Sequence, residues 1–331
     1  MLIDGHGREV RYIRLSITDR CNLRCFYCRA EREMRFIPHE QILTYEELVE
    51  LAKLAEDMGV AKIRLTGGEP FVRRDFLAFL GMLKEECPGL DIRITTNGTL
   101  LSGKAPALKH LGVRGVNISL DTLDADKFAR ITGRDFFHRV RTGLDECLRY
   151  GLRLKVNVVG LKGVNDDELP AFVELARENP IDVRFIEFMP IGCSTRWSEE
   201  NLWLAGDILE AAKGIAELRP VSGWEPNHGP ARMFDIKGGQ GRIGMISPMS
   251  DHFCDTCNRL RITADGRLRT CLFSDRELRL GPLLRSPKLG LKAVRKVMEL
   301  ALKTKPLGYE ILRERLGGSP VCGKAMTSIG G

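Results

Sequence analysis

The sequence predicts an α/β fold built around a parallel sheet, and three observations support this. Up to Gly192, six short apolar segments with strand character alternate with helical segments. Repeated βα units of this kind form parallel sheets with right-handed crossovers. Most of the expected strands end in polar or glycine-containing loops, and the carboxyl ends of such strands form the active face of α/β proteins. Beyond Gly192 short strand-like pieces replace the alternation, so we expect a second, different part of the chain.

The elements of the first part can be placed in order. A helix that begins near Thr44 carries the capping-box pair Thr44 and Glu47 and ends at Gly59. A longer helical pattern is broken near Gly133. The strands are expected at 12–17, 62–66, 92–98, 116–121, 154–159 and 183–188, and the helices at 44–58, 75–86, 104–111, 125–150 and 166–178.

The second part has a different pattern. Helices are expected at 207–218 and 291–303, and strand-like pieces at 233–236, 242–246, 260–263 and 267–270. Asp265-Gly266 between the last two pieces is a hairpin signal. We therefore expect two domains, 1–192 and 193–331, the second with short antiparallel strands.

Composition limits the class of protein. The chain has 331 residues, 43% hydrophobic and 29% charged, which is typical of a soluble globular protein. It has no apolar run long enough to span a membrane, and its start does not resemble a signal peptide, so we expect a cytoplasmic protein with no membrane partner. In that compartment its ten cysteines, clustered in spacing, suit metal ligands better than disulfides.

The net charge of +7 does not by itself define a function. It fits a solvated basic surface, and it fits equally well a set of arginines around a pocket for a small anion. The sequence has no lysine- and arginine-rich tract and no basic stripe interleaved with aromatic residues, so we expect no nucleic-acid partner.

The first cysteine group suggests a metal centre with an open position. Cys21, Cys25 and Cys28 have the spacing C-x3-C-x2-C and directly follow the first expected strand. A structural zinc site normally has four protein ligands, and four cysteines are usual for iron–sulfur clusters. Three cysteines therefore favour a cluster in which one iron is left for another ligand. Its place after a strand puts this centre at the active face.

A second group, Cys254, Cys257 and Cys271, has the spacing C-x2-C-x13-C. His252 is too close to Cys254 for a standard zinc knuckle, and no second C-x2-C pair follows. Two groups of three cysteines favour clusters at both, with zinc as the alternative. Of the scattered cysteines, Cys193 lies nearest to the end of an expected strand.

Together these motifs resemble the radical S-adenosylmethionine (SAM) superfamily and, within it, the GTP 3′,8-cyclases that begin molybdenum cofactor biosynthesis. The resemblance covers essentially the whole chain. It departs from the family pattern at Arg29-Ala30 and at Lys324. Besides both cysteine groups, it is carried by Tyr27 before the third cysteine, Gly67-Gly68-Glu69-Pro70, Ser16-Ile17-Thr18-Asp19-Arg20, Thr95-Thr96-Asn97-Gly98, Phe185-Ile186-Glu187-Phe188-Met189-Pro190 and the terminal Gly330-Gly331.

The resemblance implies an incomplete (β/α)6 TIM-type barrel with a C-terminal extension, two [4Fe–4S] clusters and SAM. One cluster would be held by Cys21, Cys25 and Cys28 and the other by Cys254, Cys257 and Cys271. The SAM contacts would be Tyr27, Gly68, Ser119 and Met189. The GTP contacts would be Arg14, Arg64, Thr95, Lys155, Arg259, Leu260 and Arg261, with Arg14, Arg259 and Arg261 as catalytic residues. We add Lys62 and Arg184 to the expected GTP contacts. The many arginines in this set suit a triphosphate, because guanidinium groups bind phosphate oxygens well.

The implied reaction converts GTP to (8S)-3′,8-cyclo-7,8-dihydroguanosine 5′-triphosphate, through a 5′-deoxyadenosyl radical that abstracts the hydrogen of ribose C3′. The resemblance also implies a reduced flavodoxin- or ferredoxin-type electron donor, cyclic pyranopterin monophosphate synthase as the next enzyme, a homodimer, and a tail at Gly330-Gly331 that reaches into the active site. Two alternatives are another radical SAM enzyme with an auxiliary cluster, such as a peptide-modifying maturase, and a zinc-stabilised nucleic-acid-binding module.

Overall fold

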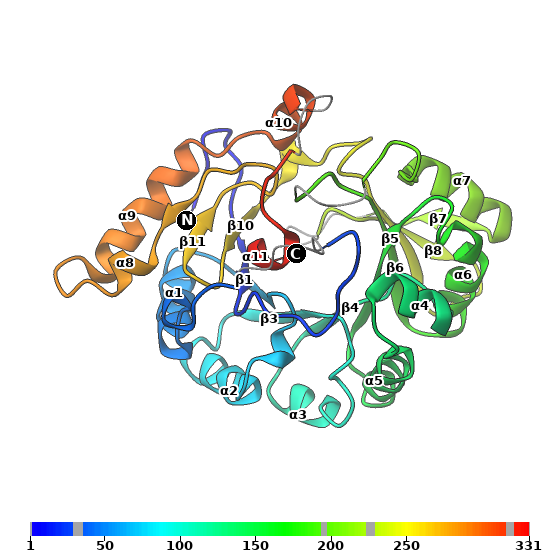
Figure 1. The fold of residues 1–331 in the computed structure, drawn as a ribbon, viewed down its shortest axis with the longest axis horizontal. Helices are drawn as coiled ribbons and strands as arrows, with labels where there is room; N and C mark the ends of the chain where they lie inside the picture. The colour runs from blue at the N-terminus through cyan, green and yellow to red at the C-terminus, as the bar shows by residue number, and fades with distance from the viewer. Residues whose placement is uncertain (1, 29–35, 193–196, 223–228, 316–320, 331) are drawn as a thin grey trace.

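The structure is a computed structural model that describes residues 2–28, 36–192, 197–222, 229–315 and 321–330. Six parallel strands, paired in sequence order, form the centre of one open sheet. Figure 1 shows this sheet as a curved wall with helices along its outer side. The six strands are β1 (Tyr12–Ser16), β2 (Lys62–Thr66), β3 (Asp91–Thr96), β4 (Gly115–Ser119), β5 (Leu154–Gly160) and β6 (Ile181–Glu187).

The helices between these strands confirm the predicted βα order. Thr44 and Glu47 form the predicted capping box, in which Glu47 N donates to Thr44 Oγ1 at 3.2 Å and Thr44 N donates to Glu47 Oε2 at 2.8 Å. Gly133 has φ +68° and separates two helices where a break was predicted. The helices are α1 (Tyr45–Asp57), α2 (Phe76–Glu86), α3 (Ala105–His110), α4 (Ala125–Thr132), α5 (Phe137–Arg149) and α6 (Leu169–Glu178), with short 3₁₀ turns η1 (His39–Gln41), η2 (Pro70–Val72) and η3 (Asp166–Glu168).

The remaining elements belong to the C-terminal part. The helix predicted to reach Leu218 ends at Ile215, because Ala216 is extended and Leu218 pairs with Ile236 in an antiparallel ladder. These elements are α7 (Ala205–Ile215), β7 (Leu218–Pro220), β8 (Arg232–Ile236), β9 (Arg242–Ile246), η4 (Cys254–Thr256), β10 (Arg259–Ile262), β11 (Arg267–Arg269), β12 (Leu278–Arg279), α8 (Gly281–Leu284), α9 (Gly290–Lys303), α10 (Gly308–Arg315) and α11 (Met326–Ile329).

The C-terminal strands extend the central sheet at both of its edges. The order is β12-β11-β10-β1-β2-β3-β4-β5-β6-β9-β8-β7. The predicted antiparallel pairing is confirmed for β7 with β8 and for the β10–β11 hairpin. It also holds for β8 with β9 and β11 with β12, while two contacts with the core that were not predicted are parallel, β10 with β1 and β9 with β6. The two edge strands of the parallel sheet, β1 and β6, have backbone N–H and C=O groups that need partners. β10 and β9 form hydrogen bonds with these groups.

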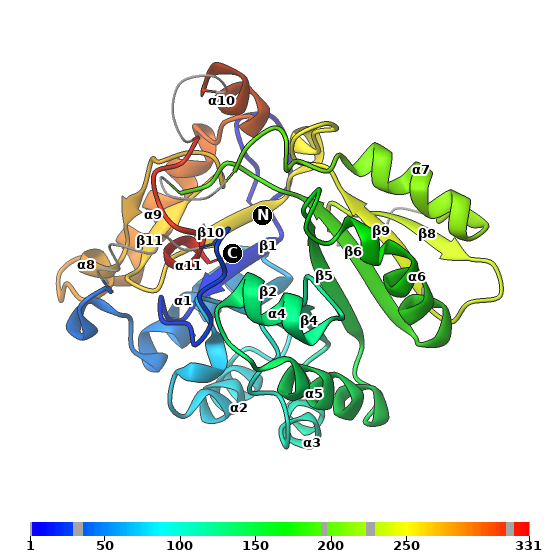
Figure 2. The same cartoon turned by 45° about the vertical axis from the view of Figure 1, so that its right-hand side comes forward.

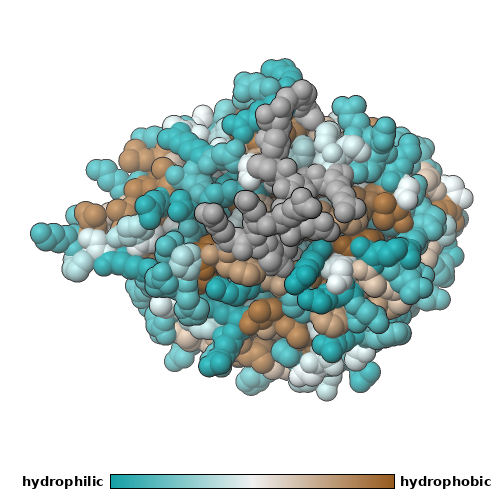
Figure 3. Space-filling view, viewed as in Figure 1, coloured by the Kyte–Doolittle hydropathy of each residue, from teal (hydrophilic) through white to brown (hydrophobic). Residues whose placement is uncertain are grey.

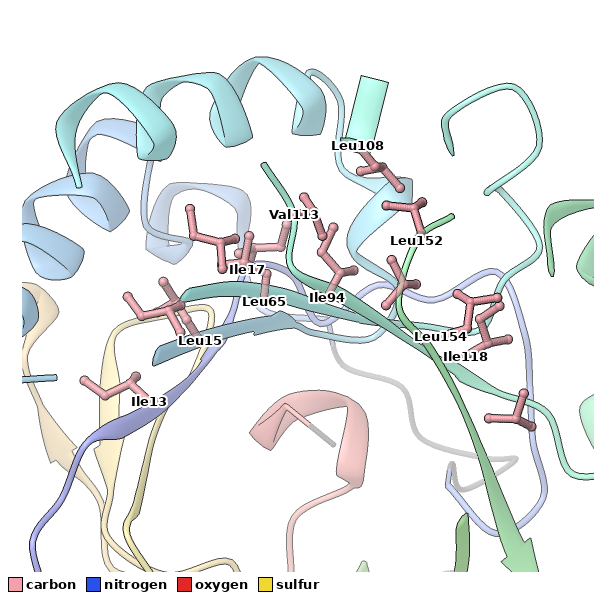
Figure 4. Packing of buried hydrophobic residues seen from close by; sticks show 14 of the residues in the cluster. Ile13, Leu15, Ile17, Leu65, Ile94, Leu108, Val113, Ile118, Leu152 and Leu154 are labelled. Carbon is pink, nitrogen blue, oxygen red and sulfur yellow. The ribbon is translucent and has the colours of Figure 1, made fainter. Parts of the chain in front are cut away.

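Strand alternation separates an apolar face from a polar one. Ile13 and Leu15 on β1 point into the main hydrophobic core, and Figure 4 shows them with Leu65 and Ile94 on the side of the sheet that faces the helices. Residues between them point to the opposite, inner side, because successive strand side chains alternate. Figures 1 and 2 place α11 and the C-terminus inside the curve of the sheet. The inner side is therefore the polar one, and it receives the end of the chain.

In the described part of the chain, no helix combines the length and apolar character needed to cross a membrane. On the face shown in Figure 3, hydrophilic residues predominate and hydrophobic ones form smaller patches.

Candidate active site

A cavity of about 370 Å³ lies on the inner side of the sheet and brings together both cysteine groups. Every residue of the predicted site lines it, with one exception. Leu260 is fully buried in the hydrophobic core, because strand alternation points its neighbours Arg259 and Arg261 to the cavity and turns Leu260 away. A side-chain contact from Leu260 to a ligand in this cavity is therefore not part of the site.

The loop with the first cysteine group is held by the ends of β3 and β4. Asn97, after β3, donates from Nδ2 to Asn22 Oδ1 at 2.9 Å and contacts Cys21 Sγ at 3.6 Å. The hydroxyl of Tyr27 donates to the carboxylate of Asp121, which follows β4. Burial raises the pKa of Asp121 to about 6, against the hydrogen bond from Tyr27. These contacts fix the loop from two sides.

The turn Gly67-Gly68-Glu69-Pro70 packs directly against the segment that follows β1. Gly68 N donates to Thr18 O at 2.7 Å and Glu69 N donates to Arg20 O at 2.8 Å. A Cβ on Gly68 would lie 2.3 Å from the carbonyl oxygen of Arg20, so this position requires glycine. Because the packing is this close, the backbone of the turn lies along the cavity. The first cysteine group lines the same cavity.

The carboxylate of Glu69 ties this turn to β3. It is fully buried and accepts from Phe71 N at 3.1 Å, Thr96 Oγ1 at 2.7 Å and Asn97 N at 2.6 Å. Burial raises the pKa of Glu69 to about 7, and these three donors oppose the rise. Glu69 is thus a positioning residue that joins the glycine turn to the Asn97 turn.

The second cysteine group lies opposite, on η4 and after β11. Arg8 donates to the carbonyl oxygen of Cys254 at 2.6 Å, and Lys305 Nζ donates to that of Cys257 at 2.6 Å. Burial would raise the pKa of Cys257, but the charges of Arg259 and Lys305 outweigh it and lower the pKa to about 7. A thiol in this setting loses its proton readily, as a metal ligand must.

Gly308 packs against two sulfurs of this group. A Cβ on Gly308 would lie 3.0 Å from Cys271 Sγ and 3.6 Å from Cys254 Sγ. Among the described residues no three His, Cys, Asp or Glu side chains are placed to chelate a single metal ion. The assignment of both groups as cluster ligands therefore stays a prediction from their spacing, and the structure adds that the two groups share one cavity.

The predicted cations line the cavity from neighbouring strands. Arg64 donates from Nε to the hydroxyl of Tyr12 at 2.7 Å, and Lys155 pairs with Asp182. Burial and the charge of Arg184 lower the pKa of Lys155 to about 7, although Asp182 opposes the shift. Burial, together with neighbouring cations, lowers the pKa values of Lys62, Lys155, Arg184 and Arg261, so the cavity favours an anionic ligand that would relieve the repulsion.

Two buried polar atoms in this cavity have no hydrogen-bond partner. They are Thr95 Oγ1 and Arg184 Nε, although Arg184 also donates from its NH2 group to Asn157 Oδ1 at 2.5 Å. Buried polar groups are normally paired, so unpaired ones at a cavity point to a polar ligand. Burial, followed by the charge of Arg64, lowers the pKa of Arg184 to about 9.

The end of the chain reaches the same cavity. The carbonyl oxygen of Gly330 accepts from Arg261 at 2.5 Å and from Arg14 Nε at 3.4 Å. Gly330 has φ +74°, and a Cβ there would lie 3.0 Å from the Cβ of Ser16. The predicted approach of the tail to the active site is confirmed for Gly330. Gly331, like Arg29, Ala30 and Cys193, lies outside the described residues.

Several cavity residues were not predicted. Strand alternation could have found three of them, because each lies two positions from a predicted site residue on the same strand face. These three are Tyr12 beside Arg14, Asn117 beside Ser119, and Asn157 beside Lys155. Residues supplied by distant segments had no such signal, and they include His252, Phe253 and Phe273 in loops and Gly308 at the start of α10.

Comparison with known proteins identifies the family. The radical SAM superfamily profile matches residues 15–176, and the Molybdenum Cofactor Synthesis C profile matches residues 181–311. A GTP 3′,8-cyclase from Listeria welshimeri is 42% identical over 100% of this chain and 99% of its own length. One from Alkaliphilus oremlandii is 38% identical over 99% of each chain, and one from Thermodesulfovibrio yellowstonii is 40% identical over 99% of each.

Solved structures agree on the fold. Streptococcus suis SuiB bound to S-adenosylmethionine aligns with a TM-score of 0.64 at 16% identity, over 97% of this chain and 77% of that one. The radical SAM superfamily implies a [4Fe–4S] cluster and SAM, which suit the first cysteine group and the glycine turn beside it. From its identity to relatives over full length, the chain belongs to the GTP 3′,8-cyclase family of radical SAM enzymes.

Proposed function

We propose that this chain converts GTP to (8S)-3′,8-cyclo-7,8-dihydroguanosine 5′-triphosphate, the first step of molybdenum cofactor biosynthesis. One observation carries the proposal: two groups of three cysteines and a set of strand-borne cations line the same cavity. A peptide-modifying maturase and a zinc-stabilised binding module are set aside, because the full-length relatives are GTP 3′,8-cyclases.

The half of the cavity near β1 to β4 is suited to hold SAM. Cys21, Cys25 and Cys28 would bind a [4Fe–4S] cluster. The backbone at Gly68 approaches its neighbours so closely that it presents main-chain groups to the cavity, and Tyr27, Ser119 and Met189 complete the lining. When bound, the cluster and SAM would supply the 5′-deoxyadenosyl radical needed to remove the hydrogen from ribose C3′. The protein holds SAM in place and keeps water away from it.

The other half is suited to hold GTP. Arg64, Lys155, Arg184 and Arg261 are buried or half-buried cations on four different strands, and phosphate oxygens bind such groups strongly. The unpaired Thr95 hydroxyl and Arg184 Nε–H can donate hydrogen bonds to phosphate oxygens. Arg14, Lys62 and Arg259 line the same region. Together these residues would fix the triphosphate and so orient ribose C3′ toward the SAM half.

We assign Cys254, Cys257 and Cys271 to a second [4Fe–4S] cluster that faces the guanine of GTP. Three thiols leave one iron for a ligand from the substrate. The proposal divides the work between the two predicted domains: 1–192 would hold SAM and most phosphate contacts, and 193–331 would hold the second cluster and Arg259 and Arg261. The boundary between the two matched profiles, at residues 176–181, supports a division in this region.

The partners follow from the reaction. A one-electron donor of the flavodoxin or ferredoxin type would reduce the protein, and cyclic pyranopterin monophosphate synthase would use the product. The homodimer implied by the family resemblance also remains a prediction.

The test is an anaerobic assay with reduced protein, SAM and GTP. We expect 5′-deoxyadenosine together with a cyclised GTP product, both detected by liquid chromatography and mass spectrometry. Replacement of GTP by ATP is the control for the nucleotide. If 5′-deoxyadenosine forms but GTP is recovered unchanged, the proposed function is wrong.

A further inference from the structure

The inner face of the sheet carries cations that no described carboxylate neutralises. Arg64, Arg184 and Arg261 are each less than a tenth exposed, and none of them forms an ion pair with a carboxylate in the described ranges. On neighbouring strands, Asp182 and Asp91 already form ion pairs with other cations. Buried charges without partners are costly, so this arrangement needs another source of negative charge.

Tyr12 is the acidic side chain that lies among these cations. It is 4% exposed, and its hydroxyl accepts from Arg64 Nε at 2.7 Å and from an NH1 donor of Arg14 at 3.4 Å. The ammonium of Lys62 lies 4.5 Å from the centre of its ring. One phenolic oxygen therefore joins two guanidinium groups from adjacent strands.

The charged groups nearest to Tyr12 are cations, and Asp182 on β6 is already paired with Lys155 and Arg242. The cations are Arg14 on β1, Lys62 and Arg64 on β2, Arg184 on β6, and Arg259 and Arg261 on β10. Burial alone would raise the pKa of Tyr12, but the charges of Arg64 and Arg14, with smaller effects of other cations, lower it to about 6. At pH 8 most Tyr12 side chains in the empty protein are therefore phenolates.

We propose that Tyr12 is a positioning residue that serves as the internal counterion of the cation pocket and gives up that role when a triphosphate enters. This rests on the proposed GTP site. In the empty pocket the phenolate holds Arg64 and Arg14 in place. When GTP brings phosphate oxygens to the same cations, the two negative groups repel each other, and Tyr12 takes a proton from solvent. As a neutral phenol it still accepts the hydrogen bond from Arg64.

The consequence is a pH-dependent affinity for GTP that a purely structural tyrosine would not produce. Above the pKa that Tyr12 has in the empty site, GTP binding must be accompanied by uptake of a proton. Rising pH therefore weakens the affinity for GTP. Tyr12→Phe removes this linkage. Lys155 also has a lowered pKa, but Tyr12 does not contribute to it, so its effect cancels in the ratio. The charge of Tyr12 raises the pKa of Lys62, so the titration of Lys62 belongs to the same linkage.

The test is calorimetric titration of GTP into the anaerobic protein with both clusters at pH 6.5, 7.5 and 8.5. We expect the ratio of Kd in the wild type to Kd in Tyr12→Phe to rise severalfold per pH unit, and uptake of one whole proton sets a limit of about tenfold. Tyr45→Phe is the matched control, because the Tyr45 hydroxyl also forms a hydrogen bond, as donor to Arg74 O, and its ring lies under an arginine, outside the cavity. A ratio for Tyr12→Phe that does not change with pH overturns the proposal.

Thermal unfolding without GTP separates this proposal from the proposed function. The folded-state pKa of Tyr12 lies below its unfolded value, so its stabilising effect is lost as pH falls through about 6. We therefore expect the difference in Tm between wild type and Tyr12→Phe to widen from pH 6 to pH 9. A constant difference overturns the role of Tyr12 even if GTP binds, and a widening one supports it even if GTP does not. If Tyr12→Phe does not fold, 3-fluorotyrosine is placed at position 12 instead. The pH dependence of Kd for GTP and that of Tm must then both move to lower pH, and unchanged profiles would refute the proposal.

Discussion

Arg261 donates a hydrogen bond of 2.5 Å to the carbonyl oxygen of Gly330, 69 residues further along the chain. Arg261 lies on β10 and Gly330 follows α11, so this contact brings the end of the chain to the inner face of the sheet. Arg14, on the adjacent strand β1, donates to the same oxygen at 3.4 Å. Two predicted GTP contacts thus hold the tail.

We expect Gly330→Ala to impair turnover of GTP while both clusters assemble normally. The substitution places a side chain at φ +74° and a Cβ 3.1 Å from Thr66 Cγ2. A left-handed residue with a Cβ costs about 1–2 kcal/mol, so a loss of roughly tenfold in product formation is expected. Gly238→Ala is the matched control, because Gly238 has φ +73° with open space around it. Equal losses in the two variants would show that strain alone, and not the place of the tail, explains the effect.

Arg261→Ala should weaken GTP binding by about tenfold to a hundredfold, since a hydrogen bond to a charged group contributes about 1.5–3 kcal/mol. The measurement is the Kd for GTP, with iron and acid-labile sulfide assayed in the same preparation. Arg219→Ala, at an exposed position on β7, should leave Kd unchanged. Loss of iron in the Arg261 variant would instead assign that residue a structural role.

The pH dependence of Asp182→Asn tests the role of Lys155. Asp182 opposes the burial and the charge of Arg184 that lower the pKa of Lys155 to about 7. Without that carboxylate the pKa falls further, and because lysine is charged mainly below its pKa, the fraction of Lys155 that is charged at pH 7.5, already a minority, becomes much smaller. We expect GTP to bind several times more weakly there, with a smaller effect at pH 6. An effect that grows on acidification would contradict this assignment of charge.

Removal of one second-group ligand should separate the two clusters. Cys271→Ala is expected to lower the iron content from about eight to about four atoms per chain, given four irons in each cluster. Formation of 5′-deoxyadenosine should persist, because the first group is intact, while cyclisation of GTP should stop. Cys147→Ala is the control, since Cys147 is a buried thiol on α5 that does not line the cavity. Iron that stays near eight in Cys271→Ala would exclude that residue as a ligand.

Local signals predicted the order of the core elements well. The capping box of Thr44 and Glu47 and the left-handed Gly133 depend on neighbours in the chain, so the sequence shows them directly. Strand alternation likewise places Arg14 and Arg64 on one face and Ile13 and Leu65 on the other. It also turns Leu260 away from the cavity, although the family resemblance included it among the GTP contacts.

Contacts between distant segments were less accessible. The parallel pairing of β10 with β1 aligns Arg14 with Arg261, and nothing in either segment specifies that register. The counterion role proposed for Tyr12 depends on charges from four strands, which come together only in the folded chain. The sequence alone shows only on which face of its strand such a residue lies.

The most direct measurement uses GTP labelled with deuterium at ribose C3′. Reduced protein is incubated anaerobically with SAM and the labelled GTP, and the 5′-deoxyadenosine is analysed by mass spectrometry. The proposed reaction predicts 5′-deoxyadenosine that carries one deuterium, together with a cyclised product that has lost it. Unlabelled 5′-deoxyadenosine, or labelled GTP recovered intact, would contradict the account of this cavity as the site where C3′ of GTP meets the SAM-derived radical.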